Sequence, residues 1–231
     1  MIDLPPEAVQ ALALSLRVSL TATVLTAPLA LALAHLLARG RFRGRDLLAA
    51  AIHLPLVLPP VVTGYALLLL FAPSAPLGAA LQAMGLPLAF RWTGAALAAG
   101  VMALPLMVRP MRLSIEAVDP GLEEAAATLG RSPWAVWRGV TLPLMAPGLL
   151  AGVTLGFAKA FGEFGATITF AASIPGETRT LPAAIYAFLQ VPGGEASVRG
   201  LVAVAVAVSL AAVVLSDVVA RRMATRLRDP A

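Results

Sequence analysis

The sequence contains no cysteine, which excludes disulfide bonds, thiol catalysis and metal sites built on thiolates. Only two histidines occur, His35 and His53, and neither has a partner at metal-ligand spacing, so we expect no metal site. Charged residues make up 13% of the 231 residues, whereas an ordinary soluble domain has about 25%. Hydrophobic residues make up 59% and fall in long blocks, a pattern typical of helices that span lipid. The composition therefore predicts an integral membrane protein.

The sequence also lacks the motifs of several catalytic classes. It has no glycine-rich loop ending in Gly-Lys-Ser or Gly-Lys-Thr that could hold nucleotide phosphates, so the chain cannot hydrolyse ATP itself. It shows no combination of nucleophile, base and orienting group that a membrane enzyme would require. The net charge of +5 comes with arginines beside apolar blocks, which indicates membrane topology rather than nucleic-acid binding. We therefore expect no enzymatic activity, no cofactor and no nucleic-acid partner.

Five apolar segments are long enough to cross a hydrocarbon core of about 30 Å as helices. They cover approximately Val18–Leu37, Leu47–Phe71, Thr93–Ile115, Leu142–Phe170 and Leu201–Val219. A sixth segment, Leu181–Val191, is too short for a span and is expected to form an interfacial or re-entrant helix. Residues Met1–Pro6 contain no basic residue and so lack the n-region of a cleaved signal peptide. The predicted fold is all-α, with five transmembrane helices, or six if the short segment also crosses, in a single domain covering residues 1–231.

Basic residues are distributed unequally between the two sides of these segments. One side carries twelve arginines and the other carries three, and such an excess marks the cytoplasmic side. The twelve are Arg39, Arg41, Arg43, Arg45, Arg109, Arg112, Arg131, Arg138, Arg221, Arg222, Arg226 and Arg228, and the three are Arg91, Arg179 and Arg199. The N-terminus is then predicted outside and the C-terminus in the cytoplasm, which requires an odd number of spans.

The segment Glu116–Pro143, between the third and fourth spans, is the most polar internal stretch and is predicted to lie in the cytoplasm. Asp119 is a favourable N-cap residue and Pro120 follows it at the first helical position. These signals predict a short helix through Leu122–Leu129 that ends at Gly130, because glycine is common after the last residue of a helix.

A second capping signal follows that glycine. Ser132 and Pro133 predict the start of another helix through Trp134–Val140, and Pro143 is expected to redirect the chain into the membrane. The segment would then form a helix, a tight turn and a helix joined to two spans. An ordinary well-capped loop would have the same local signals.

The spacing of residues in this loop is more specific. Glu124-Ala125-Ala126 is followed after three residues by Gly130 and after nine more by Val140-Thr141-Leu142-Pro143. This spacing resembles the Glu-Ala-Ala signature of the membrane subunits of type I ABC importers, except that Val140 replaces isoleucine. In that family the helix docks on an ATPase subunit, so the resemblance implies that Glu124, Ala125, Ala126, Gly130, Leu142 and Pro143 form the coupling loop.

Two further stretches resemble molybdate importer permeases. One is His53–Tyr65, and the other is Gly162–Phe170 followed by Ile174–Thr180. The resemblance implies uptake of molybdate, and of tungstate as well. It also implies a homodimer, two cytoplasmic ABC ATPase subunits and a periplasmic molybdate-binding protein that meets Pro73–Arg91 and Ala171–Arg199. The location would be the cytoplasmic (inner) membrane.

Two alternatives remain open on the sequence. Sulfate and thiosulfate permeases share a related Gly-Glu-Phe-Gly block, so the oxyanion could be sulfate. A secondary transporter without an ATPase would have no use for an exposed Glu-Ala-Ala helix, and it would usually show inverted repeats, which the sequence does not.

A path for a divalent oxyanion must bind its ion weakly enough to release it, so hydroxyl donors suit it better than a ring of arginines. The sequence offers Thr63, Thr167 and Thr169 as candidates for the path. Lys159 and Glu163 are also candidates, but their spacing of four residues favours a pair that neutralises itself within the apolar run.

The start of the fourth span carries glycines at every fourth position, Gly148, Gly152 and Gly156. Such a stripe lies on one face of a helix and lets a neighbouring helix approach closely in lipid. The sequence therefore predicts a tight helix contact along this face.

Overall fold

The structure is a computed structural model and describes residues 6–228. In that range it has eleven α-helices and one π-helical turn, and residues Met1–Pro5 of the proposed uncleaved start lie outside it. The elements are α1 (Pro6–Arg39), α2 (Arg45–Val57), α3 (Pro60–Phe71), α4 (Pro76–Ala83), α5 (Trp92–Glu116), α6 (Pro120–Thr128), α7 (Pro133–Val136), η1 (Trp137–Thr141), α8 (Leu142–Phe161), α9 (Gly165–Ala171), α10 (Leu181–Leu189) and α11 (Glu195–Arg228).

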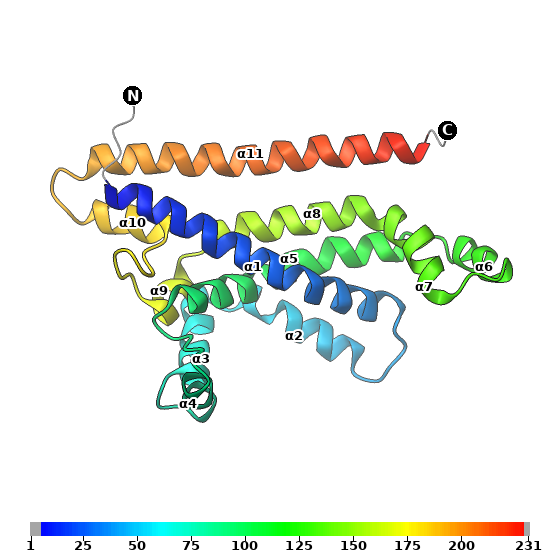
Figure 1. Ribbon diagram of the computed structural model, residues 1–231, viewed down its shortest axis with the longest axis horizontal. Helices are drawn as coiled ribbons and strands as arrows, with labels where there is room; N and C mark the ends of the chain where they lie inside the picture. The colour runs from blue at the N-terminus through cyan, green and yellow to red at the C-terminus, as the bar shows by residue number, and fades with distance from the viewer. Residues whose placement is uncertain (1–5, 229–231) are drawn as a thin grey trace.

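Four long helices run side by side along the long axis of the molecule, namely α1, α5, α8 and α11 (Figure 1). Each belongs to a helical stretch that is long and apolar enough to cross a membrane. A helix suits this position because it satisfies the hydrogen bonds of its own backbone, which lipid cannot do. The predicted spans Val18–Leu37, Thr93–Ile115 and Leu201–Val219 lie within α1, α5 and α11. The all-helical membrane fold is therefore confirmed.

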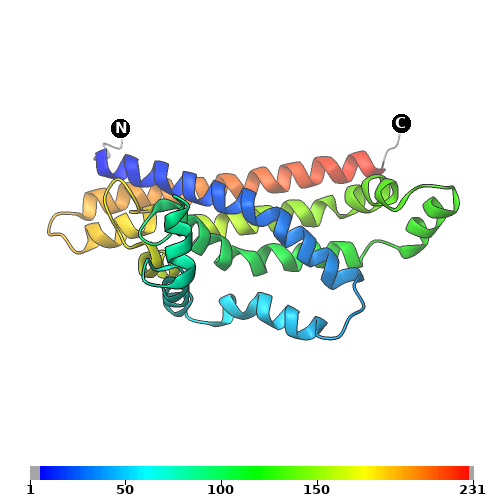
Figure 2. The ribbon, with the colours of Figure 1, turned by 60° about the horizontal axis from the view of Figure 1, so that its bottom comes forward.

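The predicted second span, Leu47–Phe71, is not one straight helix. It consists of α2 and α3, whose axes differ by 111°. The break occurs at Leu58 and Pro59, which both have extended backbone conformations. Proline removes a helical hydrogen-bond donor and disfavours helical geometry in the residue before it, so Pro59 ends α2. As a result α3 and α4 project sideways from the bundle (Figures 1 and 2).

The predicted fourth span, Leu142–Phe170, is also wrong at its C-terminal end, because it is not one continuous helix. Helix α8 ends at Phe161, and the short helix α9 follows after a break at Gly162–Phe164. A Cβ atom at Gly165 would lie 2.7 Å from the Cβ of Pro60, so this chain segment turns to pack tightly against the start of α3. The break between α8 and α9 therefore lies beside the contact of α9 with α3.

At its other end the same helix is longer than expected, because Pro143 does not redirect the chain. The helical stretch runs without a turn from Pro133 to Phe161 through η1. The Leu142 N–H donates to the carbonyl of Trp137, five residues back. This wider π turn lets the helix continue past Pro143, whose ring would clash with the carbonyl four residues back in a regular turn.

The predicted short helix at Leu181–Val191 is present as α10, nine residues long. It packs against α1 and α11, and its Leu181 N–H donates to the buried hydroxyl of Ser15 over 2.6 Å. The helix is too short to span a membrane, as its sequence indicated.

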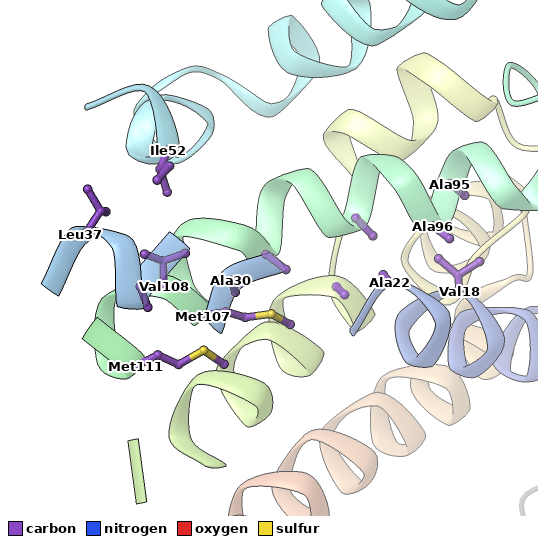
Figure 3. Close-up of a cluster of buried hydrophobic side chains, with 14 of the residues drawn as sticks. Val18, Ala22, Ala30, Leu37, Ile52, Ala95, Ala96, Met107, Val108 and Met111 are labelled. Atoms are coloured by element: carbon purple, nitrogen blue, oxygen red, sulfur yellow. The ribbon is translucent and has the colours of Figure 1, made fainter. Parts of the chain in front are cut away.

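The core of the bundle is built largely from small residues where α1, α5 and α8 meet. Figure 3 shows alanine and methionine side chains of α1 and α5 facing one another in this cluster. The glycine stripe of α8 packs against α5, as predicted. A Cβ atom at Gly152 would lie 2.8 Å from the carbonyl oxygen of Met107, so only glycine permits this approach.

Candidate functional site

Helix α6 carries the Glu-Ala-Ala sequence, and local interactions define both of its ends. The Gly121 N–H donates to Asp119 Oδ1 over 2.8 Å, and Pro120 is the first helical residue. After the helix, Gly130 has φ +81°, a left-handed conformation that side chains with a Cβ rarely adopt. The predicted cap and the predicted glycine turn are both present.

The next helix begins as the sequence indicated, although it is shorter. The Ala135 N–H donates to Ser132 Oγ over 3.3 Å, and α7 covers Pro133–Val136 before η1 continues into α8. Helices α6 and α7 therefore form a protruding unit at one end of the bundle, beside the end of α1 and the end of α5 (Figures 1 and 2).

The outer surface of this unit is exposed and partly apolar. Glu124 and Ala125 are exposed and Ala126 is half-buried. Leu122 is 50% exposed and Leu129 is 85% exposed, although both lie at the polar end of the bundle. Exposed leucines next to small residues on a short rigid helix are suited to bind another protein.

The rest of the predicted coupling loop lies elsewhere. Leu142 packs against the hydrophobic core, and Pro143 is half-buried at the start of α8. The structure therefore places four of the six proposed residues, Glu124 to Gly130, on the protruding unit. The other two belong to the helix that this unit joins.

Glu123 is a polar residue of this site that the sequence analysis missed. Its Oε2 lies 3.1 Å from Nη2 of Arg39, and its Oε1 accepts a hydrogen bond from the Thr141 hydroxyl over 2.6 Å. One signal for it exists in the sequence. Consecutive helical residues point about 100° apart, so when Glu124 faces outward Glu123 faces elsewhere.

The second group of candidate residues surrounds the break between α8 and α9. Lys159 Nζ and Glu163 Oε2 form an ion pair at 2.5 Å, as their spacing predicted. The other oxygen of Glu163 accepts a hydrogen bond from the Ala166 N–H over 2.9 Å. The Glu163 side chain is 1% exposed and the Lys159 side chain 27%. The carboxylate is thus committed to holding the start of α9, and only the lysine reaches open space.

The three threonines lie where α3 meets α9. A Cβ atom at Gly64, next to Thr63, would lie 2.5 Å from the Ala166 carbonyl oxygen, so the two helices touch. The Thr167 hydroxyl donates to the carbonyl oxygens of Glu163 and Phe164, and the Thr169 hydroxyl donates to that of Gly165.

Thr63 differs from the other two threonines. Its Oγ1 is buried and has no hydrogen-bond partner among the described residues. Of the three hydroxyl groups, it is the one left without a protein acceptor.

Ion pairs join different elements at the opposite end of the bundle. Arg91 of the α4–α5 connection lies 3.4 Å from Glu177, and Arg179 lies 3.6 Å from Glu7 of α1. The chain segment before α10 is thereby fixed against α1 and the start of α5. No group of three histidine, aspartate or glutamate residues in the described part of the chain could hold a metal ion.

The chain matches the family described as binding-protein-dependent transport system inner membrane component over residues 12–229. It is 48% identical, over 95% of its length and 96% of the relative, to the molybdenum transport system permease protein ModB of Haemophilus influenzae. It is 38% identical, over 73% of its length and 60% of the relative, to the sulfate transport system permease protein CysW of Synechococcus elongatus. The fold resembles a chain of a bacterial ABC transporter involved in alginate import, with a TM-score of 0.74, 18% identity and coverage of 94% and 80%.

Proposed function

Since the chain belongs to the family of binding-protein-dependent transport system inner membrane components, we propose that it is the membrane subunit of an ATP-driven importer of molybdate. Tungstate, a similar divalent oxyanion, is carried by the same path. The assignment of molybdate as the substrate rests on the 48% identity to a molybdenum permease, which extends over nearly the whole of both chains.

The energy for transport comes from a partner, two copies of a cytoplasmic ABC ATPase. The protruding α6–α7 unit supports this assignment because it presents Glu124, Ala125 and the exposed Leu129 away from the bundle. A ligand shifts a conformational equilibrium only through different affinities for the two states. ATP-driven closure of the ATPase pair supplies that difference, and α6 is the element that carries it to the spans.

Two copies of this chain form the path. The surfaces of α2 and α3 support this proposal. Helix α3 projects from the bundle, and both helices carry large apolar side chains that no other part of the described chain covers. They include Leu54, Leu56, Val57, Val61, Val62, Tyr65, Leu69 and Leu70. A second copy would cover this surface and close a path beside the α3–α9 contact, where the free hydroxyl of Thr63 lies.

The end of the bundle with α6 faces the cytoplasm, and a periplasmic molybdate-binding protein docks at the other end. The two sets of arginines support this orientation. Arg39 is the last residue of α1 and Arg112 lies near the end of α5, so both are at the α6 end. Arg91 directly precedes α5, and Arg179 pairs with Glu7 near the start of α1, so both are at the opposite end. The start of α1 is then outside and the end of α11 is in the cytoplasm, where the excess of arginine belongs.

The test is reconstitution of the chain in vesicles with its ATPase subunit, its binding protein and ATP. We expect molybdate uptake that requires all three, that tungstate inhibits and that a tenfold excess of sulfate leaves unchanged. Uptake without ATP would instead indicate a secondary transporter. Uptake of sulfate in preference to molybdate would favour the function named for the Synechococcus elongatus relative.

A further inference from the structure

Helix α6 is not held against the bundle by apolar packing. None of its residues is buried, whereas α5 and α8 each bury many side chains. A cavity of about 420 Å³ lies beside the helix, and its wall includes Arg39, Glu123 and Thr141. The orientation of α6 relative to the spans therefore depends on a small number of polar contacts.

Glu123 makes the contacts that reach the spans. One carboxylate oxygen lies 3.1 Å from Nη2 of Arg39, the last residue of α1. The other accepts a hydrogen bond from Thr141, which ends η1 directly before α8 and is 1% exposed. The same Arg39 nitrogen also donates to the Val118 carbonyl over 3.2 Å, in the turn that leads into α6.

These contacts join α6 to two different helices of the bundle through one side chain. Arg39 ends α1, which packs along α5, and Thr141 is buried at the start of α8. The π turn that carries Thr141 is a local departure from α-helical geometry, and such turns are frequent at functional sites. Glu124, the next residue, is exposed and has no such contact in the structure described.

We propose that Glu123 is a positioning residue for coupling: its carboxylate ties α6 to Arg39 of α1 and to Thr141 at the start of α8. A displacement of α6 is then transmitted to both spans together. The proposal rests on the proposed function, because it assigns a role within the cycle of an ATP-driven importer. The pair is partly exposed, at 27% for Arg39 and 25% for Glu123, so it adds little to overall stability.

The decisive variant is Glu123→Ala, compared with Glu116→Gln as a matched control. Glu116 lies 2.8 Å from Arg112 and 3.5 Å from Arg45, with a side chain 33% exposed, but it does not contact α6. Both variants are reconstituted with the ATPase subunit and the binding protein. Retention of the ATPase subunit, stimulated ATP hydrolysis and molybdate uptake are each measured.

We expect Glu123→Ala to keep the ATPase subunit, because the outward face of α6 is unchanged, and to reduce molybdate uptake per ATP hydrolysed by tenfold or more. Glu123→Gln should fall between this variant and the wild type, since an amide oxygen still accepts from Thr141. Glu116→Gln should stay within twofold of the wild type. The exchange Arg39→Glu with Glu123→Arg should restore part of the coupling, which a loss of folding would not allow.

Two results would overturn this assignment. Unchanged uptake per ATP in Glu123→Ala would show that the tie does not transmit movement. Loss of the ATPase subunit from that variant would instead make Glu123 part of the docking surface. A wild-type complex without ATP-dependent uptake would contradict the proposed function itself, so the two failures are distinguishable.

Discussion

Glu163 uses both of its carboxylate oxygens, one for Lys159 and one for the Ala166 N–H. A buried carboxylate without partners is costly in lipid or protein, so this arrangement explains how the charge is tolerated at the end of a span. The carboxylate is not available to line a path. Lys159 is the one lysine of the chain, and its charge is already neutralised by Glu163. A lysine in this state would bind an oxyanion only weakly, as a path that must release its ion requires.

The ion pair predicts an unequal response to its two single substitutions. Lys159→Met leaves Glu163 buried without its counter-ion and should lower the free energy of unfolding by about 3 kcal/mol. Glu163→Gln should cost less, because Lys159 is partly exposed and the amide oxygen can still accept from Ala166. The double variant should be less destabilised than the sum of the two singles. Thermal unfolding in detergent measures all three.

A matched control for this cycle is available in the exposed pair Arg91 and Glu177. Its side chains are 56% and 36% exposed, so Arg91→Met should change the free energy of unfolding by about 1 kcal/mol or less. Strictly additive losses for Lys159→Met and Glu163→Gln would show that the buried pair does not interact.

Among the helices, the sequence predicts best those features that depend on close neighbours along the chain. The caps at Asp119 and Ser132 and the turn at Gly130 follow from residues within four positions, and the structure has all three. The glycine stripe of α8 is predictable for the same reason, because its spacing alone places it on one face. Only the identity of its partner, α5, required the structure.

The breaks in the second and fourth spans could not be predicted from apolar length. Helices α3 and α9 pack against each other, with Gly64 against Ala166 and Gly165 against Pro60. These contacts join segments about a hundred residues apart, and no local signal specifies them. For Glu123 the sequence indicates only that its side chain points away from that of Glu124, and its partner Arg39 on a different helix could not be predicted.

The close contact of α8 with α5 gives a prediction for that pair of helices. Gly152→Ala should lower the free energy of unfolding by about 2 kcal/mol, because the new methyl group would lie 2.8 Å from the backbone oxygen of Met107. Gly139→Ala is the control, since a Cβ atom there meets nothing within 4 Å. It should raise stability by up to about 1 kcal/mol. Thermal unfolding of both variants side by side tests the contact, and equal stability would contradict it.

On the scale of the whole molecule, the two ends of the bundle differ in the polar contacts that join their helices. The end opposite α6 is joined by ion pairs from Arg91 and Arg179 and by the hydrogen bond between Leu181 and Ser15. The end that carries α6 is different, because α6 buries no residue and is joined to the spans through Glu123. In the proposed transport cycle, the permease can therefore receive movement at the α6 end while the opposite end stays connected.

The amount of energy involved limits how this movement can be delivered. To shift the permease from 1:99 to 99:1 between inward and outward states takes about 5.5 kcal/mol of differential binding. A single exposed ion pair supplies about 1 kcal/mol or less, so the ATPase must bind through a wider surface. In the proposed complex, the exposed face of α6 with Leu122 and Ala125, together with Leu129 directly after the helix, is that surface.

The last prediction concerns that exposed face. Ala125→Arg places a long charged side chain where a partner must approach closely, and should cause loss of the ATPase subunit from the purified complex and at least a tenfold loss of uptake. The spans should still insert, because α6 lies outside the bundle (Figure 1). Ala80 is also exposed and lies on α4, away from α6, so Ala80→Arg should retain the ATPase subunit. Because Glu123→Ala is expected to keep the subunit and lose coupling, the two variants separate binding of the ATPase from transmission of its movement. An Ala125→Arg complex that retained the ATPase and transported molybdate normally would remove α6 as the docking element.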